Sequence, residues 1–260
     1  AMLSIIIVSW NVRELLRASL HSIQRNPCTL MPQAVVVVDN ASTDGSAEMT
    51  AASFPEVELI ANRENRGFTG GNNDGLRAAE RIWSTRVAAR HGQQGLAQPL
   101  ADYVLLLNPD TEVTPGALDE LVGYAEAHGG VGVVGPQLRY PDGRVQSSRR
   151  RFPTLDVALV ESTWAQRRAP RALLDSYYVR DRGDDETCDV DWLVGAAMLV
   201  RRAAYERVGG LDEQSFFMYS EELDWQRRLR AAGWRIVHLP AAQIIHAEAR
   251  SSAPVPAATH

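Results

Sequence analysis

The chain has 260 residues, of which 45% are hydrophobic, and this is enough for one large domain with a buried core. Its formal net charge of −5 at pH 7 does not indicate nucleic acid as a partner. All 27 basic residues are arginines, which excludes a Schiff-base lysine and the lysine of a P-loop.

Short apolar runs alternate with segments of helical periodicity through the first half of the chain. The apolar runs predict strands at residues 3–9, 34–38, 57–61, 103–107 and 131–135. Helices are predicted between them at residues 12–24, 43–53 (with Ser42 or Thr43 as its cap), 72 to about 90 and 115–128. This order predicts an α/β fold, with an open, mostly parallel, Rossmann-like sheet and helices on both faces.

The second half of the chain is less regular. Residues 137–190 are rich in arginine and weakly periodic. Regular patterns return at residues 192–201, followed by a short helix and the Gly-Gly-Leu-Asp turn at 209–212. A helix is predicted at residues 221–232 with Ser220 as its cap, then a strand at 235–239 and an apolar run that ends at His246.

Polar side chains follow three of the predicted strands. They are Ser9 and Asn11, then Asp39, then Asn108 and Asp110. In open α/β sheets, ligands bind beyond the carboxyl ends of the strands, so the three clusters together predict a binding site. Each cluster taken alone is also explained by ordinary turn residues after a strand.

Three common ligand-binding motifs are missing from the sequence. The first strand is not followed by G-x-G-x-x-G, and neither the P-loop pattern nor G-x-S-x-G occurs. A dinucleotide oxidoreductase, a P-loop nucleotide hydrolase and an α/β-hydrolase are therefore disfavoured. Because these motifs are missing, we expect the site to bind its ligand with carboxylates and backbone groups.

Seven stretches that span nearly the whole chain carry a family resemblance. They are SIIIVSWN (4–11), VVVDNASTDGS (36–46), NRENRGFTGGNNDG (62–75), LLLNPDTEV (105–113), GAAMLVRRAAYERVGGLDE (195–213), FMYSEELDWQRRLRAAGW (217–234) and IIH (244–246). In these stretches and their order, the chain resembles the family 2 glycosyltransferases with the GT-A fold. The stretch QSSRRRFPT (146–154) most resembles the rhamnosyltransferases and galactofuranosyltransferases of that family.

The resemblance implies one GT-A domain over residues 1–250. Its nucleotide-sugar-binding half would be 1–135, its acceptor and catalytic half 136–250 with an insert at 148–190, and residues 251–260 are expected to be a disordered tail. It also implies an inverting, metal-dependent transferase that uses a dTDP- or UDP-sugar, with rhamnose as the first guess. The acceptor would be the hydroxyl of a saccharide or a lipid-linked molecule in bacterial polysaccharide, cell-wall or glycolipid synthesis.

The resemblance assigns donor-binding roles to several polar residues. Asp39 would read the nucleotide base or ribose, with Ser9 and Asn11 in the same pocket, because a carboxylate accepts from an imide N–H or a hydroxyl. Alternatively, Asp39 only begins a turn into the next helix. Arg66 and Asn73 flank a glycine-rich segment that the resemblance places against the nucleotide, where Arg66 would meet a phosphate. The alternative is a flexible loop with a solvated arginine.

The resemblance also implies a Mn²⁺ or Mg²⁺ site. Asp110 would hold the metal or the phosphates, since oxygen ligands suit these ions and the metal would neutralise the leaving diphosphate. The family usually has D-x-D here, and Asn108 stands in place of the first acid, which predicts a weaker or partly water-mediated metal site. His246 would join the metal, although a lone histidine after a strand is also typical of a protein core.

Three acids begin the helix predicted at 221–232. Glu222 extends the apolar stripe of that helix and should face the protein body. Asp224 lies off the stripe and has Arg228 as an i,i+4 partner. The direction in which Glu221 faces is borderline. The resemblance places the catalytic base at Glu222, with Glu221 as the alternative, and we expect the helix N-terminus to keep the base ionised. A purely structural alternative is that these acids only offset the helix dipole.

Two further features concern the acceptor. Trp192 and Gly195 would line its approach, or else serve tight packing. The arginines from Arg149 onward in the insert, next to apolar residues, suggest a contact with a membrane surface, while a solvated lid or a dimer contact explains them equally well.

Two rival functions stay open at this point. A sugar-nucleotidyltransferase also uses a nucleotide-binding α/β sheet, and a non-catalytic relative that binds a nucleotide sugar would tolerate the departures at Asn108 and Glu222. Cys28 and Cys188 show no metal or redox spacing, no apolar run reaches the roughly 20 residues of a membrane span, and no signal peptide is expected. We therefore expect a cytoplasmic protein, with a peripheral position at the inner face of the membrane as an open alternative.

Overall fold

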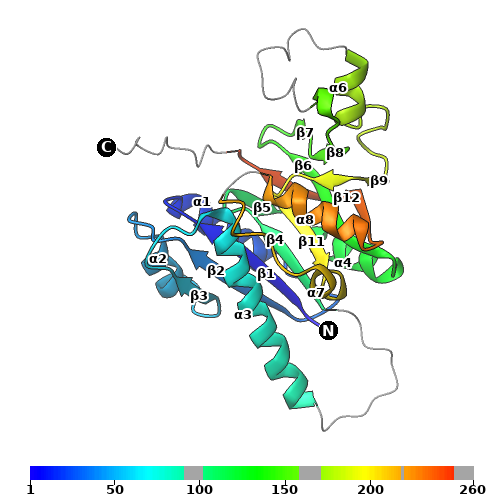
Figure 1. Cartoon of the computed structure of the whole chain (residues 1–260). Coiled ribbons are helices and arrows are strands. Elements are labelled where there is room, and N and C mark those ends of the chain that lie inside the picture. The colour runs from blue at the N-terminus through cyan, green and yellow to red at the C-terminus, as the bar shows by residue number, and fades with distance from the viewer. Residues whose placement is uncertain (91–101, 158–170, 218–219, 249–260) are drawn as a thin grey trace.

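The structure is a computed structural model that describes residues 1–90, 102–157, 171–217 and 220–248 (Figure 1). Residues 158–170 of the predicted insert, with the arginines that they carry, and the tail 251–260 lie outside the described residues. Among the described helices, none combines the length and the apolar character needed to cross a bilayer.

A ten-stranded mixed sheet forms the centre of the molecule. Its main path runs β3-β2-β1-β4-β11-β6-β12-β5, with β7 on β6 and β9 on β12, and a separate two-stranded sheet joins β10 and β8. The strands are β1 (Leu3–Ser9), β2 (Gln33–Asp39), β3 (Glu58–Ala61), β4 (Tyr103–Leu107), β5 (Thr111–Val113), β6 (Val131–Arg139), β7 (Val145–Gln146), β8 (Arg149–Arg150), β9 (Cys188–Val190), β10 (Trp192–Leu193), β11 (Ala197–Arg201) and β12 (Arg235–His246).

Helices cover both faces of this sheet, as predicted. Buried side chains of α1 (Arg13–Arg25), α2 (Ser46–Ser53) and α4 (Ala117–Ala127) pack with one set of strand residues. Those of α3 (Gly67–Arg90), α7 (Arg202–Val208) and α8 (Glu221–Ala231) pack with the other set, on the face toward the viewer in Figure 1. Strands from both halves of the chain therefore share one sheet and two core layers.

The parallel part of the sheet matches the prediction, and its direction changes at one strand. β1 pairs in parallel with β2 and β4, and β2 with β3. β11 then runs antiparallel to both β4 and β6. As a consequence, the residues just before β11 lie at the same edge of the sheet as the residues just after β4, and this edge carries the predicted site.

Several predicted boundaries were wrong for local reasons. The second helix begins at Ser46 rather than Thr43, because Gly45 adopts φ +82° and Asp44, instead of Ser42 or Thr43, accepts from the backbone and hydroxyl of Ser46. Ser220 also has positive φ and makes no side-chain cap for α8. The strand patterns at 235–239 and 244–246 are one strand, β12, interrupted by a register shift between Leu239 and Gln243.

The third helix begins at Gly67, so the segment predicted as a glycine-rich loop is mostly helical. A Cβ on Gly71 would lie 2.6 Å from Val8, and one on Gly75 would lie 2.3 Å from Ile6. These glycines therefore let α3 lie directly on β1. Their role in the structure is close helix–strand packing, which is a different use of glycine from the one predicted.

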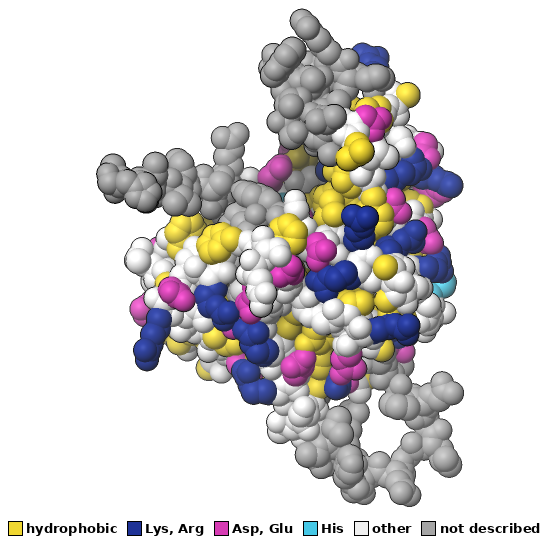
Figure 2. Space-filling model, in the orientation of Figure 1, with side chains coloured by type: hydrophobic (Ala, Val, Ile, Leu, Met, Phe, Trp, Pro, Cys, Tyr) yellow, Lys and Arg dark blue, Asp and Glu magenta, His cyan; other side chains and the backbone are white. Residues whose placement is uncertain are grey.

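The described part of the insert contains β8, α6 (Arg171–Tyr177) and several arginine–acid pairs. Arg149 contacts Asp184 at 2.6 Å and Arg151 contacts Asp181 at 2.7 Å. Arginine and acidic side chains are likewise interspersed on the face seen in Figure 2. Two of the arginines that suggested a membrane surface, Arg149 and Arg151, are thus paired with acids here, while Leu155 is the most exposed large apolar side chain described.

Candidate active site

The ends of β1 and β2 place two unpaired polar groups side by side. Ser9 and Asp39 are register partners in these parallel strands, and both are buried. Among the described residues, Oγ of Ser9 and Oδ1 of Asp39 have no hydrogen-bond partner, although Oδ2 of Asp39 accepts from the backbone N–H of Ser42 at 2.9 Å. The turn alternative thus explains one carboxylate oxygen of Asp39. The other oxygen and the serine hydroxyl have hydrogen-bonding capacity left for a ligand.

Asn11 supports the neighbouring loop. It is exposed, adopts φ +53°, and its Oδ1 accepts from the backbone N–H of Thr43 at 2.8 Å, while its own N–H donates to Oγ of Ser42. The side chain predicted to line the donor pocket therefore holds the loop that follows Asp39.

The two residues predicted on the glycine-rich segment have protein partners. Arg66 forms ion pairs with Asp74 at 2.5 Å and Glu213 at 3.0 Å, so its guanidinium has two acidic protein partners, and its contact with a phosphate stays a prediction. Asn73 is buried, and its amide both donates to and accepts from the backbone of Leu211, at 2.8 and 3.0 Å. Asn73 joins α3 to the segment that leads toward α8.

Asp110, directly before β5, and His246, the last residue of β12, lie close together, as predicted. Nε2 of His246 lies 3.3 Å from Oδ1 of Asp110, and each side chain is 9% exposed. The backbone N–H of Ala247 also donates to the carbonyl of Asp110 at 2.9 Å. Nδ1 of His246 lies 2.8 Å from Oε1 of Gln146, a residue for which we predicted no role.

This pair offers one imidazole nitrogen and carboxylate oxygens, which are suitable ligands for Mn²⁺ or Mg²⁺. Within residues 1–90, 102–157, 171–217 and 220–248, no group of three or more His, Cys, Asp and Glu side chains is arranged around a common metal position. The residues therefore fit a metal that takes its remaining ligands from phosphate and water. Asn108 contributes through its backbone, which donates to Ala196 and accepts from Thr111.

The acids at the start of α8 lie beside the loop that precedes β11. Gln226 clamps α8 to β10 with two 2.8 Å hydrogen bonds to the backbone of Leu193. One turn earlier, Glu222 packs on Gly195, where a Cβ would lie 3.6 Å from Cβ and Cγ of the glutamate. Because Ala196 accepts from the backbone of Asn108 at 2.9 Å, the same loop joins Glu222 to the strand end that carries Asp110.

Burial, rather than the helix N-terminus, dominates the ionisation of these acids. The pKa of Glu221 is raised to about 7, first by burial and then by the charge of Glu222. Burial also raises the pKa of Glu222, although hydrogen bonds from its own backbone and that of Gly195 act in the opposite direction. One oxygen of each carboxylate has no partner among the described residues. For Glu222 these backbone hydrogen bonds at the helix start and from Gly195 favour the ionised form, as expected, but they act against burial, which is the larger influence on its pKa.

Three further residues named from the sequence lie on α8 or near it. Asp224 pairs with Arg228 at 2.8 Å, as the i,i+4 spacing predicted. Trp192 is 8% exposed and its indole N–H donates to the carbonyl of Arg151, which is the tight packing expected as the alternative to an acceptor contact. Gly195, in contrast, lies directly beside Glu222 and Phe68.

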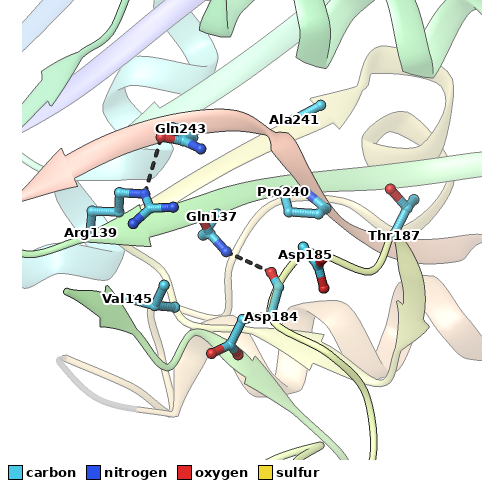
Figure 3. Close-up of a pocket in the computed structure, with 9 residues that line it drawn as sticks. All are labelled: Gln137, Arg139, Val145, Asp184, Asp185, Thr187, Pro240, Ala241 and Gln243. Atoms are coloured by element: carbon cyan, nitrogen blue, oxygen red, sulfur yellow. Dashed lines mark hydrogen bonds between the residues drawn. The ribbon is translucent and has the colours of Figure 1, made fainter. Parts of the chain in front are cut away.

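A polar pocket of about 430 Å³ lies on another part of the sheet (Figure 3). Arg139 donates to Gln243 at 3.0 Å and Gln137 donates to the carbonyl of Asp184 at 2.6 Å, so both lining residues have partners. Val145 lines the pocket, and side chains alternate along β7, so Gln146 and its contact with His246 lie on the opposite face.

The sequence matches a known family and its curated members. A family described as "Glycosyltransferase like family 2" matches residues 1–257. The chain is 34% identical over 236 residues to an N-acetylglucosaminyl-diphospho-decaprenol L-rhamnosyltransferase of Mycobacterium tuberculosis, covering 88% of this chain and 71% of that protein. It is 33% identical over 159 residues to the rhamnosyltransferase WbbL of Escherichia coli, covering 56% of this chain and 52% of that protein.

Solved structures with the same fold are more distant in sequence. GalNAc-T7, solved with UDP, GalNAc and Mn²⁺, matches with a TM-score of 0.61 at 13% identity over 94% of this chain and 43% of its own. The mannosyltransferase PcManGT of Pyrobaculum calidifontis, solved with GDP-Man and Mn²⁺, matches with a TM-score of 0.58 at 18% identity over 96% of this chain and 58% of its own.

Proposed function

We propose, because this chain belongs to glycosyltransferase family 2, that it is a metal-dependent inverting transferase of a sugar from a nucleoside diphosphate to a hydroxyl acceptor. The observation that carries the proposal is the meeting of Asp110 and His246 at the end of the sheet, with Nε2 and Oδ1 3.3 Å apart. An imidazole nitrogen and a carboxylate, both nearly buried, are ligands that a divalent cation such as Mn²⁺ takes in proteins.

In this proposal, Asp110 and His246 hold Mn²⁺ or Mg²⁺ together with the diphosphate of the donor. The metal would neutralise the charge that develops on the leaving diphosphate. Ser9 and Asp39 bind the nucleoside, since their unpaired buried oxygens can accept from an imide N–H or a ribose hydroxyl. Asn11 supports this pocket indirectly, through the loop that it holds.

Glu222 is the proposed general base, and its support is the position against Gly195 on the loop bonded to Asn108. The acceptor hydroxyl gives its proton to the Glu222 carboxylate while its oxygen forms a bond to the anomeric carbon. The bond from that carbon to the diphosphate oxygen breaks, and the nucleoside diphosphate leaves with the electron pair. Displacement from the face opposite the leaving group inverts the anomeric configuration.

The relatives suggest the substrates. Two of them are named rhamnosyltransferases, one for a decaprenol-diphosphate-linked acceptor, so we propose dTDP-rhamnose as donor and a lipid-diphosphate-linked saccharide as acceptor. A peripheral contact with the membrane would bring the enzyme to such an acceptor. Its support is the exposure of Leu155, 88%, at the edge of the insert.

The test is thermal unfolding in the presence of UDP-, dTDP- and GDP-sugars, each with and without Mn²⁺, for the wild type and Asp110→Ala. A ligand that binds the folded state raises its stability by mass action. We expect a Mn²⁺-dependent rise in Tm with dTDP-rhamnose that Asp110→Ala loses. An unchanged Tm with every nucleotide sugar, in a folded protein, contradicts the proposal.

A further inference from the structure

Gln146 contacts the ring nitrogen of His246 that faces away from Asp110. Its Oε1 lies 2.8 Å from Nδ1 of His246, within normal hydrogen-bonding distance, while Nε2 of the same ring faces Oδ1 of Asp110 at 3.3 Å. An amide oxygen only accepts, so this contact is a hydrogen bond when Nδ1 carries the proton. In the neutral ring, Nε2 then carries a lone pair that points toward the carboxylate.

Gln146 has a second side-chain partner, Tyr140. Hydrogen bonding to Glu248 raises the pKa of Tyr140, and a hydrogen bond with the Gln146 side chain acts in the opposite direction. Arg144 lies over the Tyr140 ring at 5.1 Å.

The backbone fixes the place of Gln146 as well. Gln146 is the last residue of β7 and pairs with Leu138 on β6, and Leu138 pairs with Ile244 on β12. His246 ends β12, two residues after Ile244, so both side chains project from adjoining parts of the same sheet face. The contact joins residues 100 positions apart and is buried from bulk water on the histidine side.

We propose that Gln146 is a positioning residue of the metal site, holding His246 in the Nδ1–H tautomer with Nε2 directed at the metal position beside Asp110. This inference rests on the proposed metal role of Asp110 and His246. Partners of this kind set the tautomer and ring orientation of metal-binding histidines, and their loss typically weakens metal binding by 10- to 100-fold.

The first experiment measures Mn²⁺ binding directly, from the electron paramagnetic resonance signal of free Mn²⁺, without nucleotide or turnover. Gln146→Leu removes the acceptor at similar side-chain volume, and we expect the dissociation constant for Mn²⁺ to rise at least about tenfold. Gln146→Glu keeps an acceptor for Nδ1–H and should bind Mn²⁺ close to wild type. Gln243→Leu is the matched control, because this β12 glutamine contacts Arg139 and should leave Mn²⁺ binding unchanged.

The second experiment reads the tautomer from the ¹⁵N chemical shifts of His246 in the metal-free protein, at a pH where the ring is neutral. We expect Nδ1–H in the wild type and in Gln146→Glu, and a shift toward Nε2–H in Gln146→Leu. A wild-type ring protonated on Nε2 alone overturns the inference whatever the metal does.

Comparison with Asp110→Ala separates the inference from the proposed function. If Asp110→Ala loses Mn²⁺ and Gln146→Leu binds it as tightly as wild type, the metal site stands and the role of Gln146 is wrong. If the wild type binds Mn²⁺ no better than Asp110→Ala, the metal part of the proposed function fails and the inference fails with it.

Discussion

Gly195 lies beside Glu222 and leaves between its backbone and the glutamate side chain a space that one methyl group would fill. A Cβ on Gly195 would lie 3.6 Å from Cβ and Cγ of Glu222 and 3.6 Å from Cζ of Phe68. Glu222, the proposed base at the start of α8, therefore lies against the loop that joins β10 to β11, beside the ends of the parallel strands.

Glu222→Gln should abolish most sugar transfer and leave donor binding intact. The amide keeps the shape of the side chain but cannot accept the acceptor proton, and losing a general base typically costs 10²- to 10⁴-fold in kcat. Steady-state kinetics give kcat, and calorimetry with the nucleoside diphosphate gives donor affinity.

Glu221→Gln is the neighbouring control, expected to lower kcat far less than Glu222→Gln. An equal loss of donor affinity and kcat in Glu222→Gln would instead assign Glu222 to donor binding. A variant of Glu222 with full transfer activity would favour a different base.

Glu221 should make the stability of the protein depend on pH. Burial first, and the charge of Glu222 second, raise its pKa from 4.5 to about 7, so the folded state binds more protons than the unfolded chain between these values. The free energy of unfolding therefore falls as the pH rises through this interval. Glu221→Gln removes the free-energy cost of ionising this buried carboxyl. At pH 8 the variant should therefore be more stable than wild type by up to about 3 kcal/mol.

The measurement is urea unfolding of the wild type and Glu221→Gln at pH 5 and pH 8. The difference between the two proteins should be small at pH 5 and larger at pH 8. The same difference at both pH values would mean that Glu221 is not buried as a protonated acid.

Asp39→Asn should weaken the binding of the nucleoside diphosphate. The substitution keeps an oxygen that can accept from the backbone of Ser42, but it removes the charge from the unpaired oxygen in the pocket. Charged acceptors form the stronger hydrogen bonds, so we expect the dissociation constant to rise about tenfold. Calorimetry with dTDP and UDP checks this, and unchanged affinity for both would contradict the pocket assignment.

Gly75→Ala should destabilise the protein by about 1–3 kcal/mol. The added Cβ would lie 2.3 Å from Cγ2 of Ile6, a fully buried side chain on β1, so α3 or the strand must move. Gly123 in α4 is the matched control, because its Cβ would lie 3.5 Å from the exposed side chain of Leu30. Gly123→Ala should stabilise by roughly 0.5–1 kcal/mol through helix propensity, and urea unfolding measures both.

The sequence predicted the strands of the parallel half well, because each is a short, continuous apolar run bounded by turn residues. Tyr103–Leu107 was predicted to the residue, and the polar groups after the strands do gather at one edge. Periodicity also placed Asp224 on Arg228 and Glu222 beside Gly195, but it did not single out Glu221, which is the buried acid of α8. These features depend on residues that are close to one another in the sequence.

Features that depend on distant partners escaped prediction. Nothing near Asn73 in the sequence indicates that its amide bonds the backbone of Leu211, and nothing near Gln146 indicates a contact with a histidine 100 residues later. The antiparallel course of β11 has the same origin, since its direction is decided by pairing with β4 and β6. Motifs identified candidate residues, and the tertiary contacts decided which of their polar atoms have protein partners.

The late position of β12 in the chain has a consequence during synthesis on the ribosome. In the described sheet, β5 pairs with β12 alone, so the segment just after Asp110 has no neighbouring strand until residues 235–246 emerge. At about 5–20 residues per second, that interval lasts on the order of ten seconds. Nascent chains should therefore expose this edge to chaperones, and the contact between Asp110 and His246 can form only after nearly all of the sheet has been translated.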